Sequence, residues 1–547
     1  MKRRGRLTDR AILGLMLAVL WVVIAGPGLR AQNDGANDPA IQQSLKGFTN
    51  VFGLIEQNYA EPVKPDLAIY GPDTGNGLNT LGAIPGMLRT LDPHSNFFDP
   101  TRFAQLREEM QGRYYGVGMR IAGHIGKMGK FETEVVQPLP GSPAFRAGLR
   151  PGDVITSVNG KSTFNLDSSK VADMLKGPQG TVVHISVSRE GYDKPLEFTI
   201  TRDRILQQSV TDAFFLSPGI AYIHITSFDE TTNEELSSDI QKLGGEQKLQ
   251  GLVLDLRDNP GGLLNQAVAV SDHFLEKHQL IVYHVGRRSD EKKYYARHGE
   301  TGNPFPIVVL INRFTASAAE IVTGALQDHD RALVMGEPSF GKGLVQSEFP
   351  LSEHTMLLLT TAHYYTPSGR LIQRDYSHVS LYDYYNRSEK DPAPHTQMKL
   401  TDGGRQVYGG GGITPDLHFM DPKLNPVQER LVDEDAFFAF SRHYLGVHKT
   451  IPPDFKPDDG VIADFRKFLD SRKEPLTDPE LAANLHFIRE HIRVPLVAAI
   501  YGQNQADQIA VENDPEVQKA LDSFNQARQL LVQARHYMAS KGEQPTY

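Results

Sequence analysis

Short apolar runs of strand length, alternating with helical segments, constrain the fold of this chain more than any other feature. The runs with strand character are residues 220–225, 252–256, 307–311, 332–335 and 356–361. Helical segments are predicted among them at 234–243, 266–275 and 318–326. Buried strands separated by helices predict an α/β core with a largely parallel sheet.

A second unit precedes this core and has the pattern of a small β-rich module with one or two helices. Its predicted strands are 131–136, 182–187 and 196–200, and its turn signals are the dipeptides at 140–141, 151–152 and 159–160. The segments on either side of these two units show helical patterns instead.

With 547 residues, the chain is too long for one ordinary domain. The patterns predict a multidomain α/β protein in which a β-rich unit is inserted between helical regions and the core. The predicted division is 1–31 for a signal peptide or membrane anchor, 32–106 for an N-terminal helical region, 107–202 for the β-rich unit, 203–420 for the α/β core and 421–547 for a C-terminal helical extension.

The N-terminus has the pattern of an export signal. Basic residues at positions 2, 3, 4 and 6 precede an apolar run at 11–25, a Gly-Pro-Gly break at 26–28 and the small residue Ala31. Cleavage after Ala31 is favoured, but retention as an anchor stays open because the run is close to the shortest that spans a bilayer. In both cases the rest of the chain is predicted to be periplasmic or otherwise extracytoplasmic.

Composition excludes several classes of function. The net charge of −9 and the isoelectric point near 6.1 provide no basic surface for nucleic acid. The absence of cysteine excludes disulfides, thiolate zinc sites and a cysteine nucleophile. His486 and His491 are five positions apart, so they do not form the HExxH pattern of zinc proteases. No metal or organic cofactor is expected.

Ser317 and Lys342 are the strongest candidates for chemistry. Ser317 is predicted to open a helix, where its hydroxyl is exposed and free N–H groups, including that of Ala318, face a developing oxyanion. Burial can lower the pKa of a lysine from about 10.4 to roughly 7 to 8, where it accepts a proton. Gln346 lies four residues after Lys342, on the same face of a helix or a strand. Taken singly, Ser317 also fits a helix cap and Lys342 an exposed turn.

A strand that ends in a glycine-rich turn, residues 255–262, is a second candidate element. Glycines let the backbone approach a ligand closely and donate N–H groups to it. The sequence therefore predicts a further oxyanion donor, the N–H of Gly262 or of its neighbour Gly261. An ordinary turn between a strand and a helix is the alternative.

Together these segments resemble the carboxyl-terminal processing proteases, also called tail-specific proteases, of peptidase family S41. The matching stretches are DLRDNPGG at 255–262, TASAAE at 315–320, GEPSFGKGLVQ at 336–346, LDPHS at 91–95 and FDP at 98–100. The resemblance covers roughly residues 40–420 and implies a crotonase-like α/β protease core.

The resemblance also implies roles for particular residues. Ser317 is the implied nucleophile, Lys342 the general base and Gln346 the residue that orients the lysine. Glu320 and Asp328 match positions that acids occupy in the family, where a buried salt bridge would be enough to explain them.

The β-rich unit resembles a bacterial PDZ domain. The resemblance implies that Tyr115, Gly116, Val117 and Gly118 form the loop whose backbone N–H groups capture the terminal carboxylate of a peptide, which adds as a strand. A small β-barrel without a ligand is the alternative.

Other chemistries fit the sequence less well. Residues 336–342 match the start of a phosphate-binding loop, but Gly343 stands where a serine or threonine should hold magnesium. A Ser-His-Asp triad would need a nearby histidine, and His329 should lie about 18 Å along the helix that Ser317 opens. His224 and His363 are not excluded.

The sequence as a whole predicts an exported serine endopeptidase with a Ser-Lys dyad that cleaves proteins near their C-termini after PDZ recognition of the tail. The expected partners are proteins or peptides with a free C-terminus, a second copy of the chain through its helical ends, and a membrane through the N-terminus. The main alternative is a PDZ-bearing peptide receptor without turnover. Replacing Ser317 by alanine separates the two, because only an enzyme would lose its function.

Overall fold

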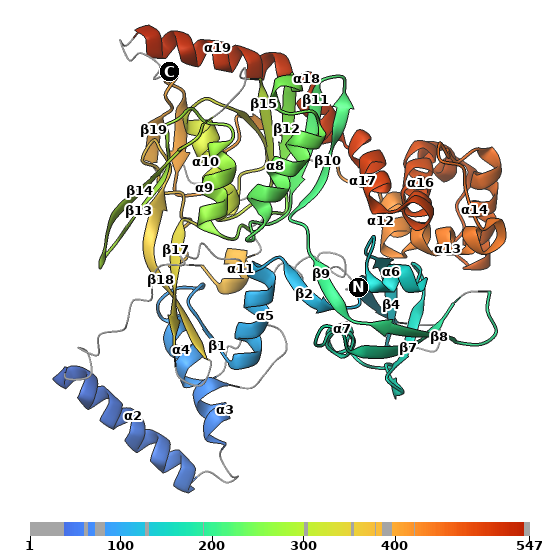
Figure 1. The fold of residues 1–547 in the computed structure, drawn as a ribbon, viewed down its shortest axis with the longest axis horizontal. Helices are drawn as coiled ribbons and strands as arrows, with labels where there is room; N and C mark the ends of the chain where they lie inside the picture. Colours follow the sequence, from blue (N-terminus) through green and yellow to red (C-terminus); the bar gives the residue numbers. More distant parts are fainter. Residues whose placement is uncertain are drawn as a thin grey trace.

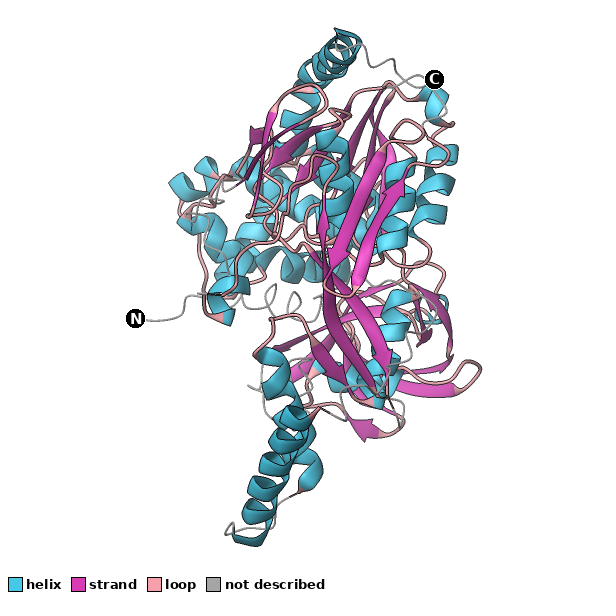
Figure 2. Cartoon of the chain, turned by 90° about the vertical axis from the view of Figure 1, so that its left-hand side faces the viewer, coloured by secondary structure: helices cyan, strands magenta, loops and turns pink. Residues whose placement is uncertain are grey.

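The computed structural model describes ten stretches of the chain, shown in two views in Figures 1 and 2. They are residues 38–58, 64–71, 82–125, 131–189, 191–299, 305–351, 355–377, 379–385, 397–420 and 422–540. The predicted signal peptide or anchor, residues 1–31, lies outside them. Across the described stretches, no helix combines the length and the hydropathy needed to cross a membrane.

A six-stranded sheet forms the centre of the α/β core (Figure 1). In spatial order its strands are β10 (Val210–Ser217), β11 (Ile220–Ile225), β12 (Gly251–Asp255), β15 (Ile307–Ile311), β16 (Leu333–Gly336) and β21 (Leu417–His418). All neighbouring pairs from β11 to β21 are parallel, and β10 runs antiparallel to β11. The largely parallel sheet is therefore confirmed.

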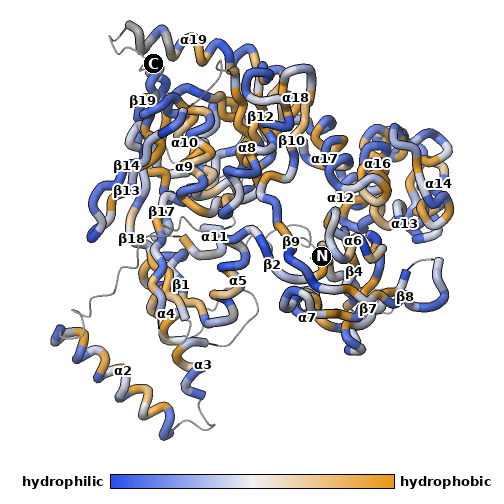
Figure 3. Tube along the Cα trace, viewed as in Figure 1, coloured by the Kyte–Doolittle hydropathy of each residue, from blue (hydrophilic) through white to orange (hydrophobic). Residues whose placement is uncertain are grey.

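Helices cover both faces of this sheet. One face packs against α8 (Thr232–Lys242), α9 (Leu264–Asp272) and α10 (Ala318–Asp328), and the other against α18 (Pro515–Asp522) and α19 (Phe524–Ser540). Successive strand residues point to opposite faces: Leu254 belongs to the first hydrophobic cluster, and its neighbour Val253 to the second. Figure 3 shows the hydrophobic segments gathered in this central region.

A second sheet of five strands lies beside the core, with β18 (Met356–Tyr365) at its centre. Antiparallel to β18 run β1 (Asn96–Phe98), β13 (Leu280–Gly286) and β17 (Leu344–Pro350), and β14 (Ser289–Tyr295) extends the sheet from β13. The predicted strand at 356–361 thus belongs to this sheet and not to the parallel one.

The N-terminal region is not purely helical, which corrects the prediction for residues 32–106. Its helices are α2 (Pro39–Asn58), α3 (Pro65–Tyr70), α4 (Ala83–Arg89) and α5 (Pro100–Met110). Strand β1 lies between α4 and α5 and pairs with β18, so that Phe98 stands opposite Met356. This segment is therefore built into the second sheet.

The β-rich unit has its own hydrophobic core, which includes Val135, Ile155 and Ile185. Its sheet contains β3 (Met119–Ile125), β4 (Phe131–Pro138), β5 (Val154–Val158), β6 (Lys161–Ser162), β7 (Val182–Ser188) and β8 (Leu196–Thr201). Helices α6 (Pro143–Ala147) and α7 (Ser168–Leu175) accompany it, and β2 (Arg113–Gly116) pairs with β9 (Asp203–Leu206).

The C-terminal helices divide into two groups. Helices α12 (Pro426–Asp433), α13 (Ala436–His448), α14 (Asp459–Ser471), α15 (Asp478–Ala483), α16 (Leu485–Tyr501) and α17 (Gln503–Glu512) enclose a separate core. Arg442 of this bundle contacts Glu134 of β4 at 2.7 Å. Helices α18 and α19 return to the central sheet. The remaining elements are α11 (Leu381–Tyr385), β19 (Gln397–Leu400), β20 (Gln406–Gly409) and a short 3₁₀ helix, Glu246–Lys248.

Candidate active site

Ser317 lies in a sharp turn between β15 and α10. Its backbone has φ 58° and ψ −116°, a conformation that costs a non-glycine residue roughly 1–3 kcal/mol and persists where surrounding contacts enforce it. The side chain is fully buried, and Oγ has no hydrogen-bond partner among the residues that the structure describes. A strained backbone and an unpaired hydroxyl together are typical of a functional position.

Glu320 connects this turn to the segment that carries Lys342. One carboxylate oxygen accepts hydrogen bonds from the backbone N–H of Ser317 at 2.7 Å and of Lys342 at 2.9 Å. The other accepts from the N–H of Gly341 at 2.7 Å and the hydroxyl of Ser339 at 2.5 Å. Because one oxygen atom binds both amides, the backbones of Ser317 and Lys342 lie side by side. Burial raises the pKa of Glu320, and these four donors oppose that effect.

Tyr364 makes a second connection between the same two residues. Its hydroxyl oxygen lies 3.0 Å from the carbonyl oxygen of Ser317 and 2.5 Å from that of Lys342. The side chain is completely buried, and burial raises its pKa well above the ordinary value. Tyr364 could not be predicted from the sequence, since a tyrosine in a strand carries no signal for this contact.

Lys342 is almost completely buried, with 2% of its surface exposed. Burial lowers its pKa from an ordinary value of 10.5 to about 7, and the carboxylates of Asp92 and Glu320 oppose the shift. A buried lysine with this pKa is neutral in a substantial fraction of molecules at neutral pH, so its amine can accept a proton.

Gln346 extends from β17 and is fully buried. Its side-chain nitrogen donates to the carbonyl oxygen of His94 at 2.8 Å. Its amide oxygen has no hydrogen-bond partner in the described part of the chain, which leaves an acceptor for an amine or an ammonium group. A β-bulge lies between Val345 and Gln346 in the pairing with β18, and bulges re-aim side chains next to active sites.

The glycine turn at 255–262 packs directly against Ser317. A Cβ atom on Gly261 would lie 2.6 Å from Cβ of Ser317, and one on Gly262 only 2.0 Å from the carbonyl oxygen of Phe228. Gly262 forms an isolated bridge with Phe228 through the Gly261 carbonyl and the Leu263 N–H, so its own N–H takes no part in the bridge. The N–H of Ala318, the first residue of α10, precedes the helical hydrogen bonds.

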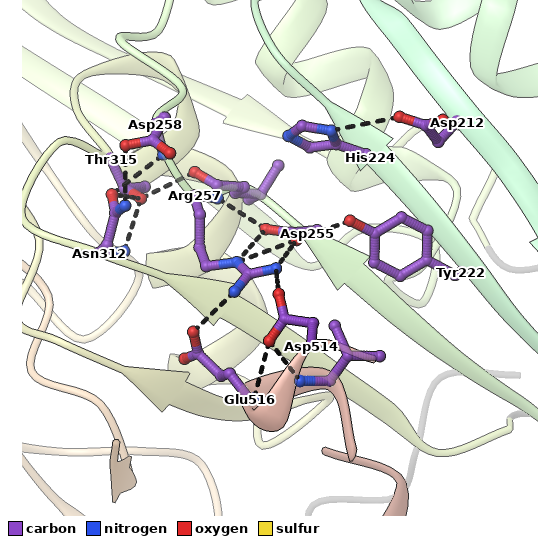
Figure 4. Close-up of polar contacts among 12 residues, drawn as sticks. Asp212, Tyr222, His224, Asp255, Arg257, Asp258, Asn312, Thr315, Asp514 and Glu516 are labelled. Carbon is purple, nitrogen blue, oxygen red and sulfur yellow. Dashed lines mark hydrogen bonds and ion pairs between the residues drawn. The ribbon is translucent and has the colours of Figure 1, made fainter. Parts of the chain in front are cut away.

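A buried charge cluster holds the other end of this turn (Figure 4). The guanidinium of Arg257 contacts Asp255 at 2.6 Å, Asp514 at 2.8 Å and Glu516 at 3.0 Å. Asp255 also accepts a hydrogen bond of 2.8 Å from the hydroxyl of Tyr222. Because Asp514 caps α18 and Glu516 lies in its first turn, the C-terminal helices are joined to the turn that carries Gly262.

Asp328 and His329, which were also weighed in the sequence, have structural contacts. Asp328 forms the buried salt bridge expected for it, at 2.5 Å from Arg370. His329 ends α10, at the opposite end from Ser317, and its Nδ1 lies 2.6 Å from Asp402. In the described part of the chain, Ser317 Oγ is hydrogen-bonded neither to a histidine nor to Lys342.

The predicted carboxylate loop of the β-rich unit joins β2 to β3. Tyr115 is 37% exposed and Val117 is buried in the core of the unit. Gly118 has φ 75°, and its carbonyl oxygen accepts from the hydroxyl of Ser142 at 2.7 Å. A Cβ atom on Gly118 would lie 2.4 Å from that of Ser142, so the loop depends on glycine there.

Comparisons with known proteins match both units. A model of peptidase family S41 matches residues 219–378, which contain Ser317, Lys342 and Gln346. A model of the PDZ domain matches residues 134–189, within the β-rich unit. The chain is thus a serine-type peptidase that carries a PDZ domain.

Individual relatives show which peptidases of this class the chain is similar to. The chain is 41% identical over 294 residues to a carboxy-terminal-processing protease of Bartonella bacilliformis, covering 53% of this chain and 66% of that protein. It is 38% identical over 303 residues to a carboxyl-terminal-processing protease of Synechocystis, covering 55% of this chain and 70% of that protein. A solved photosystem II D1 C-terminal processing protease aligns at 26% identity with a TM-score of 0.35, over 77% of this chain and 95% of that one. The chain belongs to the carboxyl-terminal processing proteases of family S41, as its motifs predicted.

Proposed function

We propose that this protein is an exported endopeptidase in which Ser317 and Lys342 form a catalytic dyad, and that it cleaves proteins near their C-termini. The observation that most supports this proposal is the environment of Lys342. Its amine is buried with a pKa near 7, and Glu320 and Tyr364 each bind the backbone of both Lys342 and Ser317.

The first chemical step is acylation of the enzyme. Neutral Lys342 takes the proton from the hydroxyl of Ser317, whose oxygen attacks the carbonyl carbon of the scissile peptide bond. The N–H groups of Gly262 and Ala318 donate to the oxyanion that forms. The lysine ammonium then protonates the departing amine as the C–N bond breaks, which leaves an ester between Ser317 and the substrate.

The second step is deacylation. Lys342, neutral again, takes a proton from water, and the hydroxide formed attacks the ester carbonyl. The same N–H groups donate hydrogen bonds to the oxyanion that forms. The bond between Ser317 and the substrate then breaks, and the Ser317 oxygen receives the proton from Lys342. Throughout, the free amide oxygen of Gln346 accepts a hydrogen bond from the lysine and orients it.

The PDZ unit supplies the preference for C-termini. The N–H groups of the loop Tyr115, Gly116, Val117 and Gly118 bind the terminal carboxylate, and the tail adds as a strand. Ser317 and Lys342 are both buried, so substrate must reach them through a movement of the surrounding segments.

The predicted domain limits, the export signal at 1–31, membrane association through it and a homodimer through the helical ends stay part of this proposal. N-terminal sequencing of the exported protein decides between cleavage and retention. Light scattering of the purified protein, with and without residues 38–58, tests the dimer.

The experiment for the whole proposal is proteolysis of a model protein with varied C-terminal tails. We expect tail-dependent cleavage that is abolished in Ser317→Ala and in Lys342→Arg, since guanidinium does not give up its proton. Gly118→Ala should remove the dependence on the tail, whereas Gly141→Ala should not, because a Cβ there meets nothing within 4 Å. Cleavage by Ser317→Ala at the wild-type rate would refute the proposal.

A further inference from the structure

The turn at Asp92–Ser95 is buried beside the candidate site, although in the sequence it stands out only as part of a family signature. One oxygen of the Asp92 carboxylate accepts from the backbone N–H of His94 and of Ser95, each at 2.7 Å. The other oxygen accepts from the Ser95 hydroxyl at 2.7 Å. Asp92 is 7% exposed and His94 is fully buried. Three donors therefore fix the direction of this carboxylate.

Two strands of the second sheet hold this turn in place. From β17, the side chain of Gln346 donates to the His94 carbonyl at 2.8 Å. From β18, the N–H of Thr360 donates to the Ser95 hydroxyl at 3.1 Å. The chain then continues directly into β1, where Asn96 pairs with Leu358. The turn is thus attached to the strand that follows Lys342 and to its neighbour.

Two carboxylates, those of Asp92 and Glu320, act on the charge of Lys342. Asp92 is the carboxylate that most favours the charged form of Lys342, ahead of Glu320. Burial, Lys342 and Arg374 hold the pKa of His94 well below its usual range, and burial also lowers the pKa of His363. Both imidazoles are therefore neutral near pH 7, and neither competes with Asp92 for the ammonium.

We propose that Asp92 is a positioning residue for the catalytic base: its carboxylate stabilises the ammonium that Lys342 becomes on taking the Ser317 proton, and its turn holds Gln346 through His94. This inference rests on the proposed Ser-Lys mechanism. A proton moves from oxygen to nitrogen in a buried site, and a buried positive charge is costly without a fixed counter-charge. Asp92 provides that counter-charge.

Asp92→Asn tests this inference, because asparagine keeps an oxygen for the two backbone N–H groups and removes the charge. Without the carboxylate the ammonium is less stable, so the pKa of Lys342 falls. We expect the acidic limb of the profile of kcat/KM against pH to move to lower pH by about one unit. Ser95→Ala is the matched control, since it loosens the same turn without changing its charge and should leave the limb in place. Asp92→Glu should restore the wild-type limb.

The outcomes separate this inference from the proposed function. An acidic limb that stays in place in Asp92→Asn overturns the role of Asp92, provided that wild-type protein shows the limb and Lys342→Arg is inactive. Absence of the limb in wild-type protein overturns the dyad itself. If Asp92→Asn does not fold, the pKa of Lys342 is measured directly by NMR. The ¹³Cε resonance of Lys342 is followed against pH in the Ser317→Ala background. It is assigned by its loss in Lys342→Met. A Lys342 resonance that titrates at the same pH in wild type, Asp92→Glu and Ser95→Ala supports the role of the charge. A titration that moves in Ser95→Ala, where the charge at position 92 is kept, would refute it.

Discussion

The side-chain amide of Gln346 donates a hydrogen bond of 2.8 Å to the carbonyl oxygen of His94, across a separation of 252 positions in the sequence. This contact fixes which end of the Gln346 amide faces the N-terminal turn, because a carbonyl accepts only from the nitrogen. The amide oxygen is consequently directed elsewhere and has no partner in the described part of the chain. The N-terminal segment therefore helps to determine how the side chain of Gln346 is oriented.

Peptidase activity should depend on the protonation of Lys342. Burial lowers the pKa of this lysine to about 7, and only the neutral amine accepts a proton. We expect kcat/KM for a short peptide to be low at pH 5, to rise about tenfold per pH unit below the pKa, and to level off above pH 8. Initial rates in buffers of constant ionic strength measure this. A flat profile between pH 5.5 and 8.5 would be incompatible with a lysine base.

Lys342→Met should stabilise the fold while removing activity. In the unfolded chain lysine titrates near 10.4, but in the folded protein Lys342 titrates at about 7. Between these values the unfolded state binds the extra proton, so the contribution of Lys342 to the free energy of unfolding increases with pH from 7 to 10. Methionine should raise the free energy of unfolding at pH 7 by roughly 2–4 kcal/mol.

Urea unfolding of both proteins at pH 7 and pH 9.5 measures this difference. The gain should be smaller at the higher pH. Lys399→Met, at an exposed strand position, is the control and should change stability little. A methionine variant that is less stable than wild type at pH 7 would show that burying the charged form of Lys342 does not destabilise the fold.

Gly262→Ala should remove activity through the oxyanion site. The residue has φ 144°, and a new Cβ would lie 2.0 Å from the carbonyl oxygen of Phe228, so the turn must shift and its N–H with it. Loss of one oxyanion donor typically reduces kcat by 10²–10³-fold. Gly180→Ala also has a positive φ but meets nothing within 4 Å, and it should retain kcat. Equal losses in the two variants would indicate a general backbone effect.

Removing the C-terminal carboxylates around Arg257 should impair catalysis from a distance. Figure 4 shows the guanidinium of Arg257 with the carboxylates of Asp255, Asp514 and Glu516. The double variant Asp514→Asn with Glu516→Gln leaves Asp255 as the remaining charged partner of these three. Breaking such a buried network costs about 3 kcal/mol or more of stability. We expect kcat to fall with KM nearly unchanged, because the turn with Gly262 is displaced and the PDZ unit is not.

Steady-state kinetics and thermal unfolding on the same samples check this prediction. Asp459→Asn, whose carboxylate is exposed and paired with Arg489, is the matched control and should affect neither quantity. An unchanged kcat in a less stable double variant would show that the charges around Arg257 contribute to stability and not to catalysis.

Local patterns were sufficient for much of the fold. The run at 307–311 matches β15 residue for residue, because a central strand is apolar along its whole length. Strand β1 could not be predicted, since three residues are too few to show an alternating pattern and its conformation comes from pairing with β18. The helical tail was predicted, but its division into a bundle and two helices on the sheet depends on tertiary packing.

The candidate site was predictable only in part. Motifs identified Ser317, Lys342 and Gln346, because their residue types and neighbours are specific. The contacts of Tyr364 and Asp92 arise where distant segments meet, and no local pattern encodes them. The positive φ of Ser317 likewise follows from the contacts around the turn and not from serine itself.

The return of α18 and α19 to the central sheet has a consequence for how this enzyme matures. Residues from 515 onward shield one whole side of the sheet, including Val308 and Leu310. Until they are in place, the strand leading to Ser317 is open to water on that side, and Arg257 lacks its contacts with Asp514 and Glu516. A chain whose residues from 515 onward have not yet folded onto the sheet should therefore be proteolytically silent.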